Sequence, residues 1–262
     1  MRDVGDSRAG GISCGIAVMA KASVPGRTKT RLTPPLTATE AAAFNTAFLK
    51  DVSVNLLAAG RQVPIHGYMA YGPPGSQQFF LDNLPGEIGL IESWLPHFGD
   101  CLFTAINGLF AAGHASAVVL NSDSPTLPTA LLVETAVMLA QPGDRAVLGP
   151  STDGGYYLLG IKQAHRRLFE DIDWSTERVA RQTLERAAEI GLDVHCLPQW
   201  YDVDDSQALR RLYTELFEDG SLDPALTPFN AANTAALMDE LLATADLRTR
   251  LGLTRTAERL AS

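Results

Sequence analysis

The 262-residue sequence has few cysteines and no long apolar run. Its three cysteines are odd in number and far apart, which argues against a disulfide framework or a CxxC metal site and fits a reducing compartment. No stretch approaches the roughly 18 consecutive apolar residues that a membrane-spanning helix needs. The first eleven residues are polar and lack the apolar core of a secretory signal. We therefore expect a cytoplasmic protein without a membrane span.

Several common catalytic motifs are also missing. The five histidines are dispersed and form no HExxH pair, which argues against a zinc hydrolase. Neither a GxSxG nucleophile elbow nor a GxGxxG dinucleotide-binding turn occurs. The basic stretch near residue 29 is not a P-loop, because Ser23 and Thr28 stand where that motif requires glycine.

Positive charge is scarce relative to negative charge. The chain has 21 lysines and arginines against 30 acids, a net charge of −9, so broad binding to nucleic acid is not expected. Hydrophobic residues at 46% and charged residues at 19% are typical of a globular protein and exclude a disordered or collagenous chain. A local basic cluster could still hold a phosphate.

Short apolar segments alternate with amphipathic ones along most of the chain. We expect strands over residues 12–20, 63–70, 89–92, 116–121, 146–149, 156–161 and 193–197. We expect helices over residues 39–59, 77–83, 100–112, 129–140, 177–190 and 206–217. Thr39 is the expected cap of the first long helix, and Gly60, Gly113 and Gly191 are the expected helix stops. This order predicts a mostly parallel sheet covered on both faces, with mixed strand direction near residue 156.

The composition of the sequence changes after Gly220. Two prolines follow, and then an alanine- and leucine-rich stretch that predicts two further helices. We therefore expect a flexible arm over residues 1–11, one α/β domain over 12–220 and a helical tail over 221–262. The tail could close the site, form a homodimer or pack on the sheet.

A basic loop, KASVPGRTKTRL, follows the first predicted strand. It carries Lys21, Arg27, Lys29 and Arg31 around a Pro-Gly pair. Loops at the carboxyl ends of strands line the ligand crevice in open α/β sheets. Four cations at such a place favour a phosphate or diphosphate ligand. The alternative is a solvated basic loop.

Acidic residues follow two other segments. Asp123 comes directly after the strand at 116–121, where a carboxylate can hold Mg²⁺ or Mn²⁺. Its alternative role is turn formation in Ser-Asp-Ser-Pro. Asp202 and Asp204 are two residues apart, so on extended chain they share a face, and a cation between them would relieve their repulsion. Asp205 is placed to cap the helix at 206.

Two turn motifs complete the set. Asp153-Gly154-Gly155 is a strong turn signal, and the following Tyr156 could contact a sugar or base. The alternative is a plain hairpin with core tyrosines. In DWST, Ser175 or Thr176 would cap the next helix, while Trp174 would either staple that helix or cover a ligand ring.

Together and in this order, the motifs resemble the DUF2064 group of nucleotide-diphospho-sugar transferase-like proteins. The carrying segments are MAKASVPGRTKTRL (19–32), SDSPTLP (122–128), GPSTDGGYYLLG (149–160), DWST (173–176) and YDVDD (201–205). The resemblance spans about residues 13–217. It implies a three-layer α/β/α GT-A (Rossmann-like) fold with a mixed, mostly parallel sheet. Some members are described as arsenosugar-biosynthesis-type glycosyltransferases, and the first loop is also similar to that of lactate and phosphoenolpyruvate guanylyltransferases.

The resemblance implies a metal-dependent glycosyltransferase that moves a sugar from a nucleotide-diphospho-sugar to an unknown small-molecule acceptor. It places the nucleotide phosphates on Lys21, Gly26, Lys29, Thr30, Arg31 and Ser122. It places Mg²⁺ or Mn²⁺ on Asp123, with Asp202 or Asp204 as a second contact, and the sugar or acceptor near Gly154, Gly155, Tyr156 and Trp174. Asp123 would be catalytic through the metal, and Asp153 would be the base if the enzyme inverts.

The chain departs from the family pattern at two places. Gly99-Asp100-Cys101 stands where an arginine-containing element is expected, and Asp123 is flanked by serines instead of a second acid. Two alternatives therefore stay open. One is a guanylyltransferase-like nucleotidyltransferase that joins an NTP to a phospho-acid and releases pyrophosphate, and the other is a non-catalytic nucleotide-binding protein.

Overall fold

The computed structural model describes residues 13–218, 225–244 and 246–253. Within them, seven strands form one sheet in the order β3-β2-β1-β4-β6-β5-β7. The strands are β1 (Cys14–Lys21), β2 (Ile65–Gly72), β3 (Gly89–Glu92), β4 (Ser116–Leu120), β5 (Arg145–Pro150), β6 (Tyr156–Ile161) and β7 (Asp193–Cys196). Among these strands only β6 is antiparallel to its neighbours. The predicted mixed, mostly parallel sheet is confirmed.

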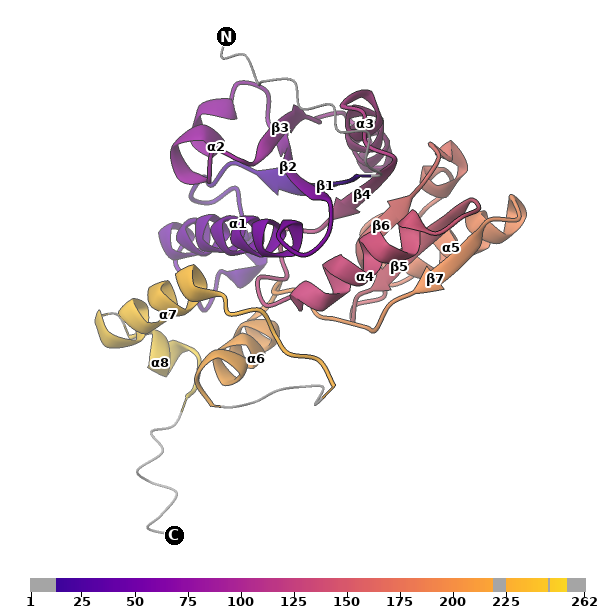
Figure 1. Ribbon diagram of the computed structural model, residues 1–262. Coiled ribbons are helices and arrows are strands. Elements are labelled where there is room, and N and C mark those ends of the chain that lie inside the picture. The colour runs from indigo at the N-terminus through magenta and orange to yellow at the C-terminus, as the bar shows by residue number, and fades with distance from the viewer. Residues whose placement is uncertain (1–12, 219–224, 245, 254–262) are drawn as a thin grey trace.

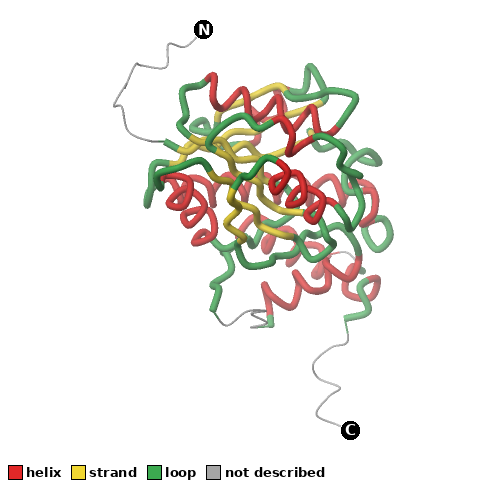
Figure 2. Tube along the Cα trace, turned by 90° about the vertical axis from the view of Figure 1, so that its right-hand side faces the viewer, coloured by secondary structure: helices red, strands yellow, loops and turns green. Residues whose placement is uncertain are grey.

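Helices cover both faces of the sheet (Figures 1 and 2). They are α1 (Ala38–Gly60), α2 (Gln77–Asn83), α3 (Phe98–Ala111), α4 (Thr129–Ala140), α5 (Val179–Glu189), α6 (Ser206–Phe217), α7 (Ala232–Thr244) and α8 (Leu247–Arg250), with short 3₁₀ turns η1 (Thr30–Leu32) and η2 (Arg166–Phe169). Alternate residues of β1 point to opposite faces, since Ile16 and Val18 join the core under α1 and α4 while Ala17 joins the core under α3 and α5. The predicted three-layer α/β/α architecture is confirmed.

Helix α1 begins and ends at residues other than those predicted. Helix α1 is capped by Thr37 and not by Thr39, because Thr37 and Glu40 form a reciprocal capping box. The expected stop at Gly60 is also wrong: Gly60 is the last helical residue and Arg61 continues in right-handed conformation. Gly113 and Gly191 do take positive φ angles, 93° and 66°, after α3 and α5.

The C-terminal segment packs on helix α1. Buried Asp51 of α1 accepts four hydrogen bonds at the start of α7, from the backbone and side chains of Asn233 and Thr234 at 2.6–2.9 Å. Arg250 of α8 pairs with both carboxylate oxygens of Glu40. The described part of the tail therefore packs on helix α1.

The expected arm at 1–11 and the tail residues 221–224 and 254–262 lie outside the described residues. No helix in the described part of the chain combines the length and apolar character needed to cross a bilayer.

Candidate functional site

A pocket of 380 Å³ opens at the carboxyl edge of the sheet, where β1 and β4 end and β6 begins. The loop after β1 supplies its cations, and the loop after β4 supplies Ser122 and Asp123. Its lining comprises Met19, Lys21, Arg27, Thr28, Lys29, Thr30, Arg31, Asn45, Phe98, Leu102, Val119, Leu120, Asn121, Ser122, Asp123, Tyr156, Tyr157 and Asp204. The predicted basic loop and the predicted metal-site acid therefore share one cavity.

Lys29 lies at the centre of this arrangement. Its Nζ is 2.8 Å from Asp123 Oδ1, 3.2 Å from Asp204 Oδ1 and 2.8 Å from the Val203 carbonyl oxygen. Its side chain is only 5% exposed, whereas that of Arg31 is 75% exposed and lies 3.9 Å from Asp204. The backbone of Lys29 is left-handed, with φ 51°. The loop thus turns one cation inward onto the acids and leaves another facing the opening.

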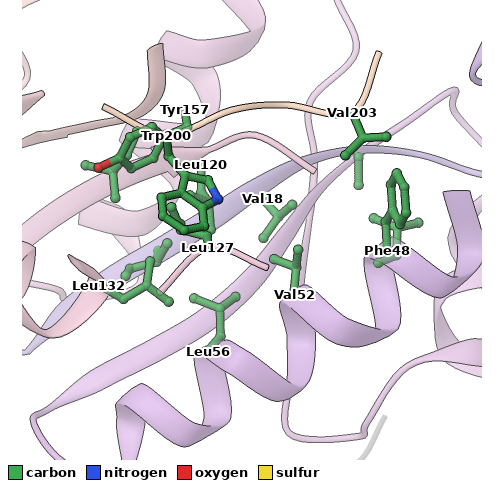
Figure 3. Close-up of a cluster of buried hydrophobic side chains, with 14 of the residues drawn as sticks. Val18, Phe48, Val52, Leu56, Leu120, Leu127, Leu132, Tyr157, Trp200 and Val203 are labelled. Carbon is green, nitrogen blue, oxygen red and sulfur yellow. The ribbon is translucent and has the colours of Figure 1, made fainter. Parts of the chain in front are cut away.

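Backbone contacts explain why Asp123 and Asp204 meet. The Val203 amide donates to the Asp123 carbonyl at 2.8 Å, and Ser124 Oγ donates to the Tyr201 carbonyl at 2.8 Å. Val203 is fully buried and lies near Phe48 in the core beneath the site (Figure 3). Hydrophobic burial of Val203 therefore fixes the segment that presents Asp204 beside the end of β4.

The two carboxylates differ in their electrostatic surroundings. Burial opposes ionisation of Asp123, but the charge and hydrogen bonds of Lys29 outweigh it and hold the pKa of Asp123 below its usual value. Burial and the negative charge of Asp123 raise the pKa of Asp204, although Lys29 opposes them. The site therefore favours ionisation of Asp123 over ionisation of Asp204.

A second acidic pair lies beside the first. Burial, followed by the charges of Asp153 and Asp204, raises the pKa of Asp202 to about 6. Asp153 Oδ1 accepts hydrogen bonds from Ser151 Oγ and from the Gly155 amide at 2.9 Å. The turn is held next to Trp200, because the Thr152 amide donates to the Trp200 carbonyl at 3.0 Å. Asp153, which is exposed, and Asp202, which is half-buried, do not line the pocket.

The aromatic residues predicted on the sugar side separate into two layers. Tyr156 lines the pocket, and its buried hydroxyl has no hydrogen-bond partner among the described residues. Burial raises the pKa of Tyr156 strongly. Trp174 does not line the pocket but packs behind it, with its ring 5.3 Å from Phe98 and 6.5 Å from Tyr156. Trp174 therefore buttresses Tyr156 and Phe98.

The predicted helix caps have mixed outcomes. Asp205 caps α6 by accepting hydrogen bonds from the Gln207 and Ala208 amides. The expectation that Ser175 or Thr176 caps α5 is wrong, because the cap position is Arg178 and has no side-chain hydrogen bond. Ser175 instead adopts a left-handed turn with φ 65°, so the helix begins at Val179.

Eight of the predicted site residues line the pocket: Lys21, Lys29, Thr30, Arg31, Ser122, Asp123, Tyr156 and Asp204. Gly26, Asp153, Gly154, Gly155, Trp174 and Asp202 do not. Sequence reasoning missed Asn45, Phe98, Leu102 and Asn121 as lining residues. Asn45 and Phe98 lie within helices, and no local pattern marks a helical residue that faces a crevice.

The donor chemistry of the acidic wall suits a divalent cation, because carboxylate oxygens are the ligands that Mg²⁺ and Mn²⁺ prefer. However, within the described residues no three Asp, Glu, His or Cys side chains are grouped so that they could hold a metal ion. The position between Asp123 and Asp204 is taken by the Lys29 ammonium. The predicted ligands Asp123, Asp202 and Asp204 therefore remain a prediction.

The chain is similar to known proteins at two levels. A family model described as "Uncharacterized protein conserved in bacteria (DUF2064)" matches residues 55–176. A crystal structure from Desulfovibrio desulfuricans G20, of a protein proposed to be a nucleotide-diphospho-sugar transferase, has a TM-score of 0.77 and 26% identity and covers 90% of this chain and 97% of that one. No curated protein matches the sequence significantly.

A more distant likeness concerns the fold alone. A cytidylyltransferase from Leptospira borgpetersenii serovar Hardjo-bovis has a TM-score of 0.50 and 10% identity and covers 90% of this chain and 97% of that one. The predicted GT-A-like fold is confirmed by these likenesses.

Proposed function

Because a DUF2064 family model matches residues 55–176, we propose that the chain is a metal-dependent glycosyltransferase that uses a nucleotide-diphospho-sugar. The observation that carries the proposal is the pocket that joins the basic loop to Asp123 at the carboxyl edge of the sheet. The similar protein from Desulfovibrio desulfuricans G20, itself proposed to be a transferase of this class, supports the same reading.

The basic side of the pocket suits a diphosphate. Lys21, Arg27 and Arg31 face it from one loop, in a chain whose net charge is −9. Arginine and lysine form strong charge-assisted hydrogen bonds with phosphate oxygens. Thr30 and Ser122 add hydroxyl donors to the same lining. We assign phosphate binding to this side, with Gly26 shaping the loop through its positive φ of 75°.

The acidic side suits the departure of the nucleoside diphosphate. A divalent cation on Asp123, with Asp202 or Asp204, would neutralise the negative charge of the diphosphate leaving group. Lys29 and Arg31 would stabilise the same negative charge with their cationic side chains. Tyr156 would contact the sugar or acceptor from the lining of the pocket.

The Asp-Gly-Gly turn would serve the acceptor side. Asp153 would accept the acceptor proton if the transfer inverts the sugar, and no such base is required if it retains. Gly154 and Gly155 hold this turn against the start of α5, where the Ala180 amide donates to the Gly154 carbonyl. Trp174 supports the ring of Tyr156 from behind.

A thermal-shift screen with nucleotide-diphospho-sugars, NTPs and free nucleotides, each with and without Mn²⁺, tests the proposal. We expect the largest stabilisation from one nucleotide-diphospho-sugar plus Mn²⁺, followed by release of free NDP when the acceptor is supplied. Asp123→Ala should abolish the metal-dependent part of the stabilisation. Asp144→Ala is the control, because Asp144 pairs with His165 away from the pocket.

The other outcomes identify the alternatives. Stabilisation by an NTP together with a phospho-acid, with release of pyrophosphate, would show a nucleotidyltransferase. Nucleotide binding without any metal dependence or turnover would show a non-catalytic binding protein. Either result would overturn the glycosyltransferase assignment.

A further inference from the structure

Lys29 directs its ammonium group at three acceptors within the protein. Its Nζ donates hydrogen bonds to the Val203 carbonyl oxygen at 2.8 Å and to Asp204 Oδ1 at 3.2 Å, and it forms an ion pair with Asp123 Oδ1 at 2.8 Å. A phosphate must therefore compete with these three contacts for the ammonium group.

The position of Lys29 is built by the fold. Its left-handed backbone sits at the start of η1, and its ammonium lies 5.2 Å from the ring centre of Phe48. Its acceptors come from the loop after β4 and from the segment before α6, and Val203 of that segment is 174 residues away along the chain. Contacts this distant in sequence, around a buried ammonium, indicate a dedicated cation site and not a chance surface pair.

The other cations of the pocket are arranged differently. Lys21 lies 5.5 Å from the ring centre of Trp94. Arg31 is largely exposed and reaches Asp204 only at 3.9 Å. These side chains are thus available to meet an incoming phosphate first, while Lys29 remains on the carboxylates.

We propose that Lys29 is an exchangeable internal cation that holds the divalent-metal position between Asp123 and Asp204 until a diphosphate draws it away. Two like charges cannot share that position, so a metal ion enters only when the ammonium leaves it. The phosphate oxygens then provide new acceptors for Lys29. The exclusion of metal stands on the geometry alone, whereas the release step rests on the proposed function.

The decisive experiment is a titration with Mn²⁺ alone, followed through the EPR signal of free Mn²⁺. Wild-type protein should bind Mn²⁺ weakly, and Lys29→Met should bind one equivalent at least about tenfold more tightly. Lys21→Met is the matched control, because it removes the same charge from the same loop without touching the acids, and it should stay within about threefold of wild type.

Three results would overturn the exclusion step. One is tight binding of one Mn²⁺ by wild-type protein, which needs no variant. Another is a folded Lys29→Met protein, judged by circular dichroism and melting temperature, whose Mn²⁺ affinity equals that of wild type. The third is an equal gain in the two lysine variants, which would indicate a general charge effect. Should Lys29→Met fail to fold, Lys29→Gln takes its place.

A second arm tests the release step with inorganic pyrophosphate in EDTA, measured by calorimetry. Wild-type protein should bind pyrophosphate without metal, and Lys29→Met should bind it about tenfold more weakly. Equal affinity in the two proteins would overturn the release of Lys29 to the phosphates. Absence of pyrophosphate binding to wild type would count against the proposed function, whereas the Mn²⁺ titration would still decide the exclusion step.

Discussion

Gly154 is a position where one added methyl group should be costly. Its φ is 90°, and an added Cβ would lie 2.2 Å from the Glu177 carbonyl oxygen. Gly26 has a similar φ of 75° but nothing within 4 Å of the added atom. We expect Gly26→Ala to lower the free energy of unfolding by about 1 kcal/mol from backbone strain. Gly154→Ala should lower it by about 3 kcal/mol, because the clash adds to the strain.

Urea denaturation of both variants measures this difference. The comparison isolates the contact, since the two glycines share the left-handed conformation and differ in the space around them. Equal losses would mean that the turn at residues 151–155 shifts easily away from α5. In that case the same turn could not hold Asp153 firmly beside Asp202.

His114 lies at the edge of the sheet opposite the pocket, and it should make the free energy of unfolding depend on pH. Its ring nitrogens lie 2.9 Å from Ser13 Oγ and 2.8 Å from Tyr68 Oη, and the ring of His66 lies 5.3 Å away. Burial, and then the charge of His66, lowers the pKa of His114 below 6.5. The unfolded chain therefore binds a proton more readily, and stability present above pH 6.5 is lost as the pH falls through the folded pKa.

The measurement is the melting temperature of wild type and of His114→Gln from about pH 7.5 to about pH 5.5. We expect the wild-type melting temperature to fall more steeply than that of the variant. The comparison matters because groups other than His114 contribute to both curves and cancel between them. Parallel curves would show that His114 is protonated as easily in the folded protein as in the unfolded chain.

At the scale of elements, the attachment of α7 depends on one side chain of α1. Asp51 is buried and accepts hydrogen bonds from two backbone amides and two side chains at the start of α7. Asp51→Ala leaves these donors without a partner, so we expect a loss of about 2–3 kcal/mol in the free energy of unfolding. Asp82→Ala, at an exposed position of helix α2, is the control and should change the free energy of unfolding by less than about 0.5 kcal/mol.

Hydrogen exchange shows whether the loss is local. In Asp51→Ala the amides of α7 should exchange faster, while those of β1 and β4 change only as much as the global stability does. Uniform acceleration across the sheet would mean that α7 unfolds together with the domain. Unchanged exchange in α7 would mean that packing against α1, and not the Asp51 cap, holds the helix.

The elements differ in how far sequence could predict them. The strands and helices up to α6 follow from hydrophobic periodicity, because each buries a face with its own repeat. The cap at Thr37 was not predicted, because Thr37 and Thr39 are both plausible caps and only the hydrogen bonds with Glu40 show that Thr37 caps the helix. The docking of α7 could not be predicted, because no residue near Asp51 in the sequence indicates that it binds a segment 182 residues later.

At the scale of the whole molecule, the strand order of the sheet accounts for the part of the candidate site that was predicted. The carboxyl ends of β1 and β4 are neighbours, so Lys21 and Asp123 had to lie near each other. The inward turn of Lys29 and the positions of Asp153 and Asp202 outside the pocket lining were not predictable. They depend on a left-handed loop residue and on the path of residues 198–204, which only tertiary packing fixes.

The net charge of the molecule and the charge of its pocket have opposite signs. The salt dependence of anion binding should show which of the two charges governs the affinity. The chain carries −9 overall, whereas Lys21, Arg27, Lys29 and Arg31 line one side of the pocket. Screening lengths fall below about 10 Å above 0.1 M salt, so charges far from the pocket matter little to a bound ligand.

We expect the affinity for pyrophosphate to fall several-fold between about 50 and about 300 mM KCl. Arg31→Gln should weaken binding and flatten this dependence, because Arg31 is the most exposed of the paired cations. Calorimetry at each salt concentration measures both effects. Binding that strengthens with salt would mean that repulsion by the acidic surface dominates, and that the pocket is not the anion site.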